Sequence, residues 1–243
     1  MNNRFFRFQV NQFVILFVER AGSTYLTTLL NSHPDVQCVT EKLDAIKNAG
    51  GGAETQLDWT EKFLTPPFLG PNRAIGFKTK EVDILDPDGF RNILQKHNCR
   101  IIQLQRKNTI KAVISTMNAK RLHDVSGSWN LLKETDRRPP LMVDLDEFAH
   151  LIELREQWDR SLENYVRRLN LPTISLFYEE LLQDEKLFLN KVFDFLGVEP
   201  KPVQGKTLKH TKDDLREVIL NFDELHSKYA DTKYSTMFDE VLV

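Results

Sequence analysis

The chain has 243 residues, with 33 lysines and arginines against 35 aspartates and glutamates, so its formal net charge is −2. This near neutrality argues against nucleic acid as the main partner, because a surface that binds a duplex needs many cations to displace counterions. With 41% hydrophobic and 28% charged residues, the composition is typical of a soluble globular protein, and we expect one cytoplasmic domain over residues 1–243.

The first predicted element is a strand from Phe13 to Val18, whose residues are β-branched, aliphatic or aromatic without polar alternation. Such a run is typical of a strand buried on both faces of a parallel sheet. It is too short to span a bilayer, and we expect no membrane span. A short turn with Gly22 follows, and from Thr24 leucines recur at helical spacing until Pro34 ends the pattern. The order strand, turn, helix predicts a βα unit.

The same alternation continues along the chain. Further strands are predicted over 36–39, 74–77, 100–104 and 173–177, and helices over 87–96, 109–122, 145–169 and 185–196. Strands that alternate with helices imply a layered α/β fold, with a central, mostly parallel sheet flanked by helices. Residues 48–72 and 123–143 show no regular pattern, and we predict irregular substrate loops there, with plain surface loops as the alternative.

The turn after the first strand spans Glu19 to Tyr25, with the sequence ERAGSTY. A buried strand that turns sharply into a helix aims free backbone N–H groups and the positive end of the helix dipole at the turn. Gly22 permits close backbone approach, Ser23 and Thr24 add hydroxyl donors, and Arg20 adds a positive charge. The G-x-x-x-x-G-K-[ST] spacing of ATP- and GTP-binding loops is absent. We therefore predict a phosphate or sulfate site, with a purely structural turn as the alternative.

The segment ERAGSTYLTTLLNSHPDV resembles the sulfotransferases that use 3′-phosphoadenosine 5′-phosphosulfate (PAPS), especially their tyrosylprotein and bacterial branches. That family carries a strand, the motif P-[KR]-S-G-[ST]-T and a helix; here Glu19 and Ala21 replace the usual Pro and Ser. The resemblance implies a P-loop NTPase-like fold and a stacking contact of Tyr25 with adenine, for which core packing is the alternative. It also implies that the 5′-phosphosulfate is held by the loop residues Arg20, Ala21, Gly22, Ser23 and Thr24.

A second motif of this family is a hydrophobic strand, an Arg, and a Ser eight or nine residues later. Here the strand segment RIIQLQ precedes Arg106, and Ser115 follows. An Arg at the carboxyl end of a strand can bind a phosphate in bidentate fashion. The resemblance implies that the pair binds the 3′-phosphate; a surface ion pair and a helix-face hydroxyl are the alternatives. The segment FYEEL resembles the family's Y-E-[DE]-L, which implies that Tyr178 lies near the adenine, with a buried packing tyrosine as the alternative.

Three residues are candidates for the transfer chemistry. Glu41 stands shortly after HPDV, where tyrosylprotein and several bacterial sulfotransferases place a glutamate base. The alternative is a solvated carboxylate paired with Lys42. In the segment FKTK, Lys80 replaces the histidine base of the cytosolic enzymes, and Lys78 matches the lysine that contacts the sulfuryl group. Arg20 takes the position of the family's catalytic Lys or Arg and is expected to stabilise the leaving oxygen.

Taken with the resemblance, these residues predict an enzyme that transfers a sulfuryl group from PAPS to an acceptor hydroxyl and releases adenosine 3′,5′-bisphosphate (PAP). No metal site is expected, because the histidines and cysteines show no ligand spacing. The acceptor is a small molecule, a carbohydrate or a peptide; Arg137 and Arg138 favour an anionic or polar one, and nothing indicates the oligomeric state. Two alternatives remain: a nucleotide-dependent kinase on a related fold, and a non-catalytic module that binds nucleotide or another anion.

Overall fold

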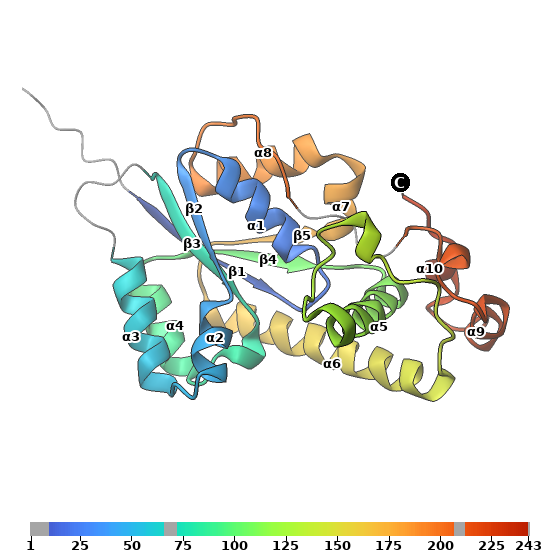
Figure 1. Ribbon diagram of the computed structural model, residues 1–243. Helices are drawn as coiled ribbons and strands as arrows, with labels where there is room; N and C mark the ends of the chain where they lie inside the picture. Colours follow the sequence, from blue (N-terminus) through green and yellow to red (C-terminus); the bar gives the residue numbers. More distant parts are fainter. Residues whose placement is uncertain (1–9, 66–71, 207–211, 243) are drawn as a thin grey trace, which may run out of the picture.

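The computed structural model of the chain describes residues 10–65, 72–206 and 212–242. Through this part of the molecule runs a five-stranded, entirely parallel sheet in the order β2-β3-β1-β4-β5 (Figure 1). Its strands are β1 (Asn11–Phe17), β2 (Val36–Thr40), β3 (Ala74–Thr79), β4 (Arg100–Gln105) and β5 (Thr173–Phe177). The apolar run of β1 occupies the centre of the sheet, where both of its faces are buried. The predicted parallel α/β fold is confirmed.

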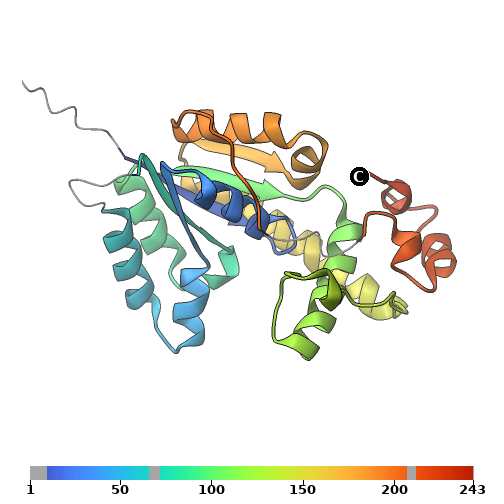
Figure 2. The same ribbon diagram turned by 45° about the horizontal axis from the view of Figure 1, so that its top comes forward.

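Helices cover both faces of the sheet, and the alternation of side chains along β1 separates the two faces. The odd-numbered residues 13, 15 and 17 pack against α1 (Ser23–Ser32), α7 (Tyr178–Gln183) and α8 (Glu185–Leu196). The even-numbered residues 14 and 16 pack against α2 (Lys42–Asn48), α3 (Ala53–Leu64), α4 (Pro87–Lys96) and α6 (Leu145–Leu169). The two layers lie on opposite sides of the strands in Figures 1 and 2.

A third apolar cluster lies on the side toward which β4 points (Figure 1). It joins α5 (Thr109–Ser126) and the first half of α6 to α9 (Phe222–Lys228) and α10 (Ser235–Asp239). Short 3-10 turns are formed by Glu81–Asp83, Glu134–Asp136 and Leu215–Glu217. Of the helices in these described ranges, not one combines the length and the apolar character that crossing a membrane requires.

Most predicted elements agree with the structure. Helices α4, α6 and α8 have the predicted bounds, and α8 ends at Gly197, which adopts a left-handed backbone with φ 69°. Helix α5 continues beyond the predicted end at residue 122 as far as Ser126, where Gly127 caps it with the same φ. The segment 127–143 is irregular apart from one 3-10 turn and an isolated bridge between Leu141 and Ile219.

The prediction that residues 48–72 are irregular is wrong in part, because α3 occupies Ala53–Leu64. This helix buries Gln56 and Thr60 together with Leu64, so polar side chains stand where an apolar repeat would have revealed it. The Gln56 amide reaches the carbonyls of Leu43 and Asp83 at 2.9 and 2.7 Å, which satisfies its donors inside the protein. Residues 66–71 of the same segment lie outside the described residues.

Candidate active site

The turn between β1 and α1 leaves the first N–H groups of α1 without a side-chain cap. Gly22 occupies the N-cap position with φ 78°, and the first helical turn contains no acidic residue. Arg20 also has a left-handed backbone, with φ 62°, a conformation that costs a residue other than glycine about 1–3 kcal/mol. Free N–H groups at the positive end of the helix dipole favour an anion in this turn.

Tyr178, the first residue of α7, packs directly on this loop. A Cβ atom at Gly22 would lie 2.3 Å from Cδ2 of the tyrosine ring, so only glycine fits beneath it. The guanidinium carbon of Arg106 lies 5.1 Å from the centroid of the same ring. Burial raises the pKa of the Tyr178 hydroxyl, which therefore stays protonated at neutral pH. The ring thus lies between the two predicted phosphate-binding segments.

The loop after β1 and the turn after β4 are joined by direct hydrogen bonds. Arg20 Nε donates to Ser115 Oγ at 3.0 Å, and Arg106 Nη1 donates to the backbone carbonyl of Arg20 at 3.1 Å. Arg20 Nη1 also donates to the carbonyl of Trp129 at 3.2 Å, which ties the irregular segment 127–143 to the same place. Burial lowers the pKa of Arg20. Residues 95 positions apart in the sequence, Arg20 and Ser115, are therefore brought into contact.

Arg106 is almost completely buried and retains unused hydrogen-bonding capacity. Its side chain is 8% exposed, and its Nε has no hydrogen-bond partner among the described residues; Glu179 Oε1 lies 4.0 Å away. Burial lowers the pKa of Arg106 to about 10, so the guanidinium stays charged at neutral pH. The Glu179 carboxylate accepts instead from the backbone N–H groups of Lys107 and Asn108, at 3.0 and 3.1 Å, and so fixes the turn after β4.

Arg155 of α6 supports the loop from the other side. It donates to the backbone carbonyl of Glu19 and forms an ion pair with Asp159, both at 2.8 Å. Sequence reasoning missed both Arg155 and Glu179, because the backbone groups that they hold lie more than 70 residues away. One feature of the sequence could have indicated Arg155. It is a charged residue on the apolar stripe of a helix, between the buried residues Ile152 and Leu162.

Lys78 joins the turn between β1 and α1, residues 19–25, to Glu41; we call this turn the anion loop. Its ammonium lies 2.7 Å from Glu41 Oε1 and donates to the hydroxyls of Thr24 and Ser23 at 2.8 and 3.3 Å. The Lys78 side chain is 2% exposed, whereas that of Glu41 is 35% exposed. Burial lowers the pKa of Lys78, and the charge of Glu41 opposes this shift. Glu41 is thus paired with the buried Lys78, and its carboxylate remains open to an incoming group.

The backbone at Glu41 is itself constrained. Its N–H donates to the carbonyl of Lys78 at 3.1 Å, and its φ of 40° lies in the left-handed region. Among described residues other than glycine, four have a positive φ, and two of these are Arg20 and Glu41. Such strain persists only where surrounding contacts enforce it, and it is common at functional sites.

Tyr25 lies on α1 beneath the segment that follows α8. Its hydroxyl donates to Glu185 Oε2 at 2.6 Å, and a Cβ at Gly205 would lie 2.0 Å from its ring. Burial, together with the hydrogen bond to Glu185, raises the pKa of Tyr25 to about 12. The fully buried Ala21 belongs to the core between α1 and the sheet. Tyr25 is therefore the one predicted cofactor residue whose hydroxyl already has a carboxylate partner among the described contacts.

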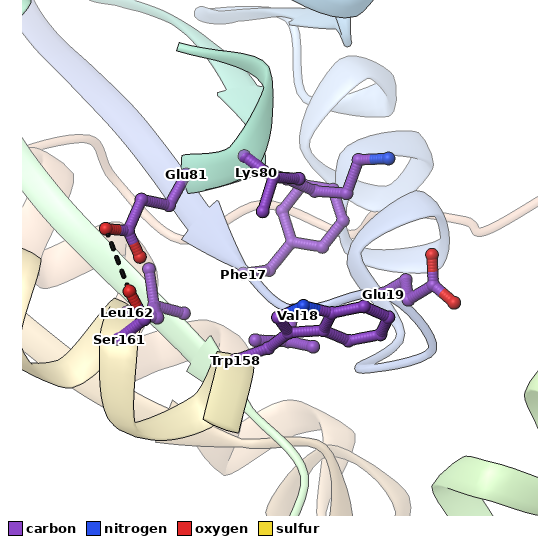
Figure 3. A pocket seen from close by; sticks show the side chains of 9 residues that line it. Phe17, Val18, Glu19, Lys80, Glu81, Trp158, Ser161 and Leu162 are labelled. Carbon is purple, nitrogen blue, oxygen red and sulfur yellow. Dashed lines mark hydrogen bonds between the residues drawn. The ribbon is translucent and has the colours of Figure 1, made fainter. Parts of the chain in front are cut away.

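A small, mainly apolar pocket of about 110 Å³ lies beside Phe17, at the carboxyl end of β1. Figure 3 shows the rings of Phe17 and Trp158 beside it, with Lys80 and Glu19 toward one end. The hydrogen bond between Ser161 and Glu81, 3.1 Å long, lies toward the other end. The ammonium of Lys78 lies 5.1 Å from the centroid of the Phe17 ring, which forms part of the pocket wall. Within the described residues, no three His, Cys, Asp or Glu side chains are grouped as a metal ion would require.

Comparison with protein families gives one decisive match. The family model of the sulfotransferase domain matches residues 11–236, which is most of the chain. The chain belongs to the sulfotransferase family. It is therefore a sulfotransferase. Its candidate site consists of the loop after β1, the turn after β4 and the carboxylate of Glu41, which follows β2.

The sulfotransferase is similar over most of its length to two curated relatives and to one solved structure. It is 26% identical over 238 residues to nodulation protein H of Rhizobium meliloti strain 1021, covering 93% of this chain and 94% of the relative. It is 23% identical to nodulation protein H of Rhizobium tropici, covering 93% and 92% of the two chains. The crystal structure of a sulfotransferase from Alicyclobacillus acidocaldarius superposes with a TM-score of 0.50 and 15% identity, covering 96% and 97%. This structural likeness concerns the fold, which is the predicted P-loop-like α/β fold.

Proposed function

We propose that this sulfotransferase transfers a sulfuryl group from PAPS to an acceptor hydroxyl and releases PAP. The observation that carries the proposal is the position of Lys78, whose ammonium touches both the hydroxyls of the anion loop and the carboxylate of Glu41. A sulfuryl group held in the loop would therefore lie next to the carboxylate of Glu41, to which we assign the acceptor proton.

The donor is expected to bind across the two joined segments. The residues Arg20 to Thr24 hold the 5′-phosphosulfate with backbone N–H groups, hydroxyls and a guanidinium. Arg106 and Ser115 hold the 3′-phosphate, and the buried, unsatisfied Nε of Arg106 supports this assignment because an anion would complete its hydrogen bonds. Tyr25 and Tyr178 flank the loop on α1 and α7 and are proposed to contact the adenine.

The transfer step is an in-line displacement at sulfur. The acceptor oxygen forms a bond to sulfur while the bond from sulfur to the 5′-phosphate oxygen breaks, and its electron pair stays on that oxygen. Glu41 receives the acceptor proton, Lys78 stabilises charge on the moving sulfuryl group, and Arg20 stabilises the leaving phosphate. Since the Lys78 ammonium already bridges loop and carboxylate, no large rearrangement is needed to align these groups.

The acceptor is proposed to enter through the apolar pocket beside Phe17 and Trp158. One wall of this pocket is the Phe17 ring, whose centroid lies 5.1 Å from the Lys78 ammonium. We place the hydroxyl-bearing end of the acceptor at the edge of this ring, toward Lys78 and Glu41. Its apolar lining suits a ring or a short aliphatic portion of a small molecule, a carbohydrate or a peptide side chain. We place the reaction in the cytoplasm, as expected for a soluble enzyme of this composition.

The first prediction separates turnover from donor binding. Glu41→Gln keeps the size of the side chain but cannot take a proton, and we expect kcat to fall by about 10²–10⁴-fold. The affinity for PAP, measured by calorimetry, should change by less than about threefold, because PAP carries no group that needs the base. Turnover is measured with radiolabelled PAPS and a panel of small-molecule, carbohydrate and peptide acceptors.

Asp44→Asn is the matched control, since Asp44 lies one turn further along and already accepts from Asn48 Nδ2 at 3.1 Å. It should leave turnover near that of the native enzyme. Equal loss of turnover and of PAP affinity in Glu41→Gln would remove Glu41 as the base. Preferential binding of ATP over PAP would favour a kinase, and PAP binding without transfer to any acceptor class would favour a non-catalytic module.

A further inference from the structure

A second pocket lies beside α5, where the irregular segment 127–143 meets the segment that leads to α9. Its volume is about 320 Å³, and the side chains that matter for its chemistry are Asn118, Arg137, Arg138, Lys212 and Glu217. Its walls are held by backbone hydrogen bonds: Leu141 N–H donates to the carbonyl of Val218, and Leu220 N–H to that of Leu141, at 2.9 and 2.8 Å. We call it the arginine pocket.

The charges around the arginine pocket do not balance. Arg137 pairs with Glu134, and Lys212 pairs with Glu217 at 2.6 Å, so these two cations have carboxylate partners. Within the described part of the chain, Arg121, next to the pocket, donates only to neutral oxygens, those of Asn118 Oδ1 at 3.1 Å and the Pro139 carbonyl at 3.0 Å. Arg138 forms no ion pair with any described residue, and its Nε is buried without a hydrogen-bond partner there.

Two guanidinium groups, those of Arg121 and Arg138, therefore lie close together without a carboxylate partner among the residues that the structure describes. Burial, followed by the charge of Arg138, lowers the pKa of Arg121, as expected for like charges in proximity. A buried, unsatisfied donor and an uncompensated positive charge both destabilise the unliganded protein. One bound anion would satisfy the free donor and reduce the repulsion, and guanidinium groups are suited to planar or tetrahedral oxyanions.

We propose that the arginine pocket binds an oxyanion of the acceptor, namely a sulfate, phosphate or carboxylate group carried next to the hydroxyl-bearing part. This inference rests on the proposed sulfuryl transfer and adds the chemical class of the acceptor. A volume of about 320 Å³ lies near the lower end of small-ligand sites, about 300–1,000 Å³, and gives room for the anion with the ring that carries it.

The arginine pocket is connected to the anion loop through α5 and through the segment 127–143. Asn118 follows Ser115 by three residues on α5, a rise of about 4.5 Å along the helix axis. The segment 127–143, which contains Arg138, also passes the anion loop, because the Trp129 carbonyl accepts from Arg20. The same chain segment thus contacts the loop at one end and forms the arginine pocket at the other.

The test compares acceptors that differ by a single anionic group. Pairs consisting of a neutral acceptor and its sulfated, phosphorylated or carboxylated counterpart are assayed with radiolabelled PAPS. We expect the native enzyme to prefer the anionic member, and Arg138→Gln to raise KM for that member by about tenfold or more, the usual effect of losing a charged hydrogen bond. KM for the neutral member and the affinity for PAP should change by less than about twofold, since neither needs the pocket.

Arg167→Gln is the matched control, because Arg167 is an exposed arginine paired with Glu163 on α6. It should behave as the native enzyme does. Arg138→Lys, which keeps the charge but not the planar fork, should recover part of the preference. No preference for the anionic acceptor in the native enzyme would overturn the proposal. A tenfold loss of PAP affinity in Arg138→Gln would also overturn it, because the pocket would then belong to the donor.

Inorganic sulfate and phosphate test whether the arginine pocket takes an anionic group of the acceptor or a free ion. The melting temperature gives a readout that does not depend on turnover. Each should raise the melting temperature of the native protein more than that of Arg138→Gln, and each should compete with the anionic acceptor. Stabilisation without competition would assign the pocket to a free ion and overturn its role in acceptor binding. Equal stabilisation of both proteins would show that the pocket takes no oxyanion, whereas failure of transfer to every acceptor would count against the proposed function alone.

Discussion

Lys78 is a lysine in a position where cations are rarely found, inside the end of the sheet. Its burial would be unfavourable without partners, since an isolated buried ammonium loses its hydration. The carboxylate of Glu41 and the hydroxyls of Ser23 and Thr24 replace that hydration. The arrangement keeps a charged donor fixed between the anion loop and the carboxylate, so that it need not reorganise when the sulfuryl group develops charge.

The pH dependence of the reaction tests the role of Lys78. Because burial lowers its pKa below the ordinary value of 10.5, the ammonium is neutralised at a lower pH than that of a free lysine. We expect kcat/KM for PAPS to fall on the alkaline side from below pH 10.5, since loss of this charge removes an anion contact. In Lys78→Arg the limb should move to higher pH, because a guanidinium holds its proton more strongly than an ammonium does.

Circular dichroism at each pH controls for unfolding in these profiles. An alkaline limb at the same pH in the native enzyme and in Lys78→Arg would show that another group is responsible. The direction in which the alkaline limb of kcat/KM moves is the informative result. A residue that acts only through its shape would leave this limb at the same pH.

At the scale of the element, the loop between β1 and α1 is shaped by one close approach. Gly22 and Gly50 have nearly the same left-handed backbone, with φ 78° and 80°, but differ in their surroundings. A Cβ at Gly22 would collide with the Tyr178 ring, whereas a Cβ at Gly50 would have nothing within 4 Å. The pair therefore separates the effect of backbone strain from that of the contact.

Gly50→Ala should lower the free energy of unfolding by about 1 kcal/mol, the cost of the left-handed backbone alone. Gly22→Ala should lower it by about 2–4 kcal/mol, because displacement of the buried ring adds to the strain. It should also weaken PAP binding by about tenfold or more, since Tyr178 contacts both the loop and Arg106. Urea unfolding and calorimetry provide the two measurements. Similar losses in the two variants would contradict a specific role for the ring contact.

Helix α6 supplies a second test of how elements hold the loop. Arg155→Met preserves the length and most of the apolar stem but leaves the Glu19 carbonyl without its donor. The penalty for an unsatisfied buried group is about 1–3 kcal/mol, and we expect PAP affinity to fall by about threefold to thirtyfold as the loop relaxes. Arg160→Met on the same helix is the control, because Arg160 is 64% exposed and forms an ion pair with Glu156 on the helix surface. Unchanged PAP affinity in Arg155→Met would limit Arg155 to packing.

For the molecule as a whole, the sequence predicted what depends on local pattern. The continuous apolar run of β1, the Pro87 at the start of α4 and the Gly197 after α8 each mark an element without reference to distant residues. Helix α3 was missed because its buried face carries Gln56 and Thr60, whose partners come from other elements. The anion loop could be found from its own motif, whereas the contacts of Arg155 and Glu179 depend on tertiary packing that no local spacing encodes.

Donor binding should stabilise the whole molecule, because one ligand would join α1, α5 and α7. PAP at about 100 times its dissociation constant should add about 2.7 kcal/mol to the free energy of unfolding. For a chain of this length, that corresponds to a rise in melting temperature of about 5–10 °C.

Adenosine 5′-phosphate at the same concentration should give a much smaller shift, because it lacks the group that Arg106 and Ser115 are proposed to hold. Arg106→Gln should bring the two shifts together, since it removes the planar fork from the 3′-phosphate site. If the native protein responded equally to both nucleotides, the turn after β4 would have no part in donor recognition, and the hydrogen bond from Arg106 to the Arg20 carbonyl would be its whole role.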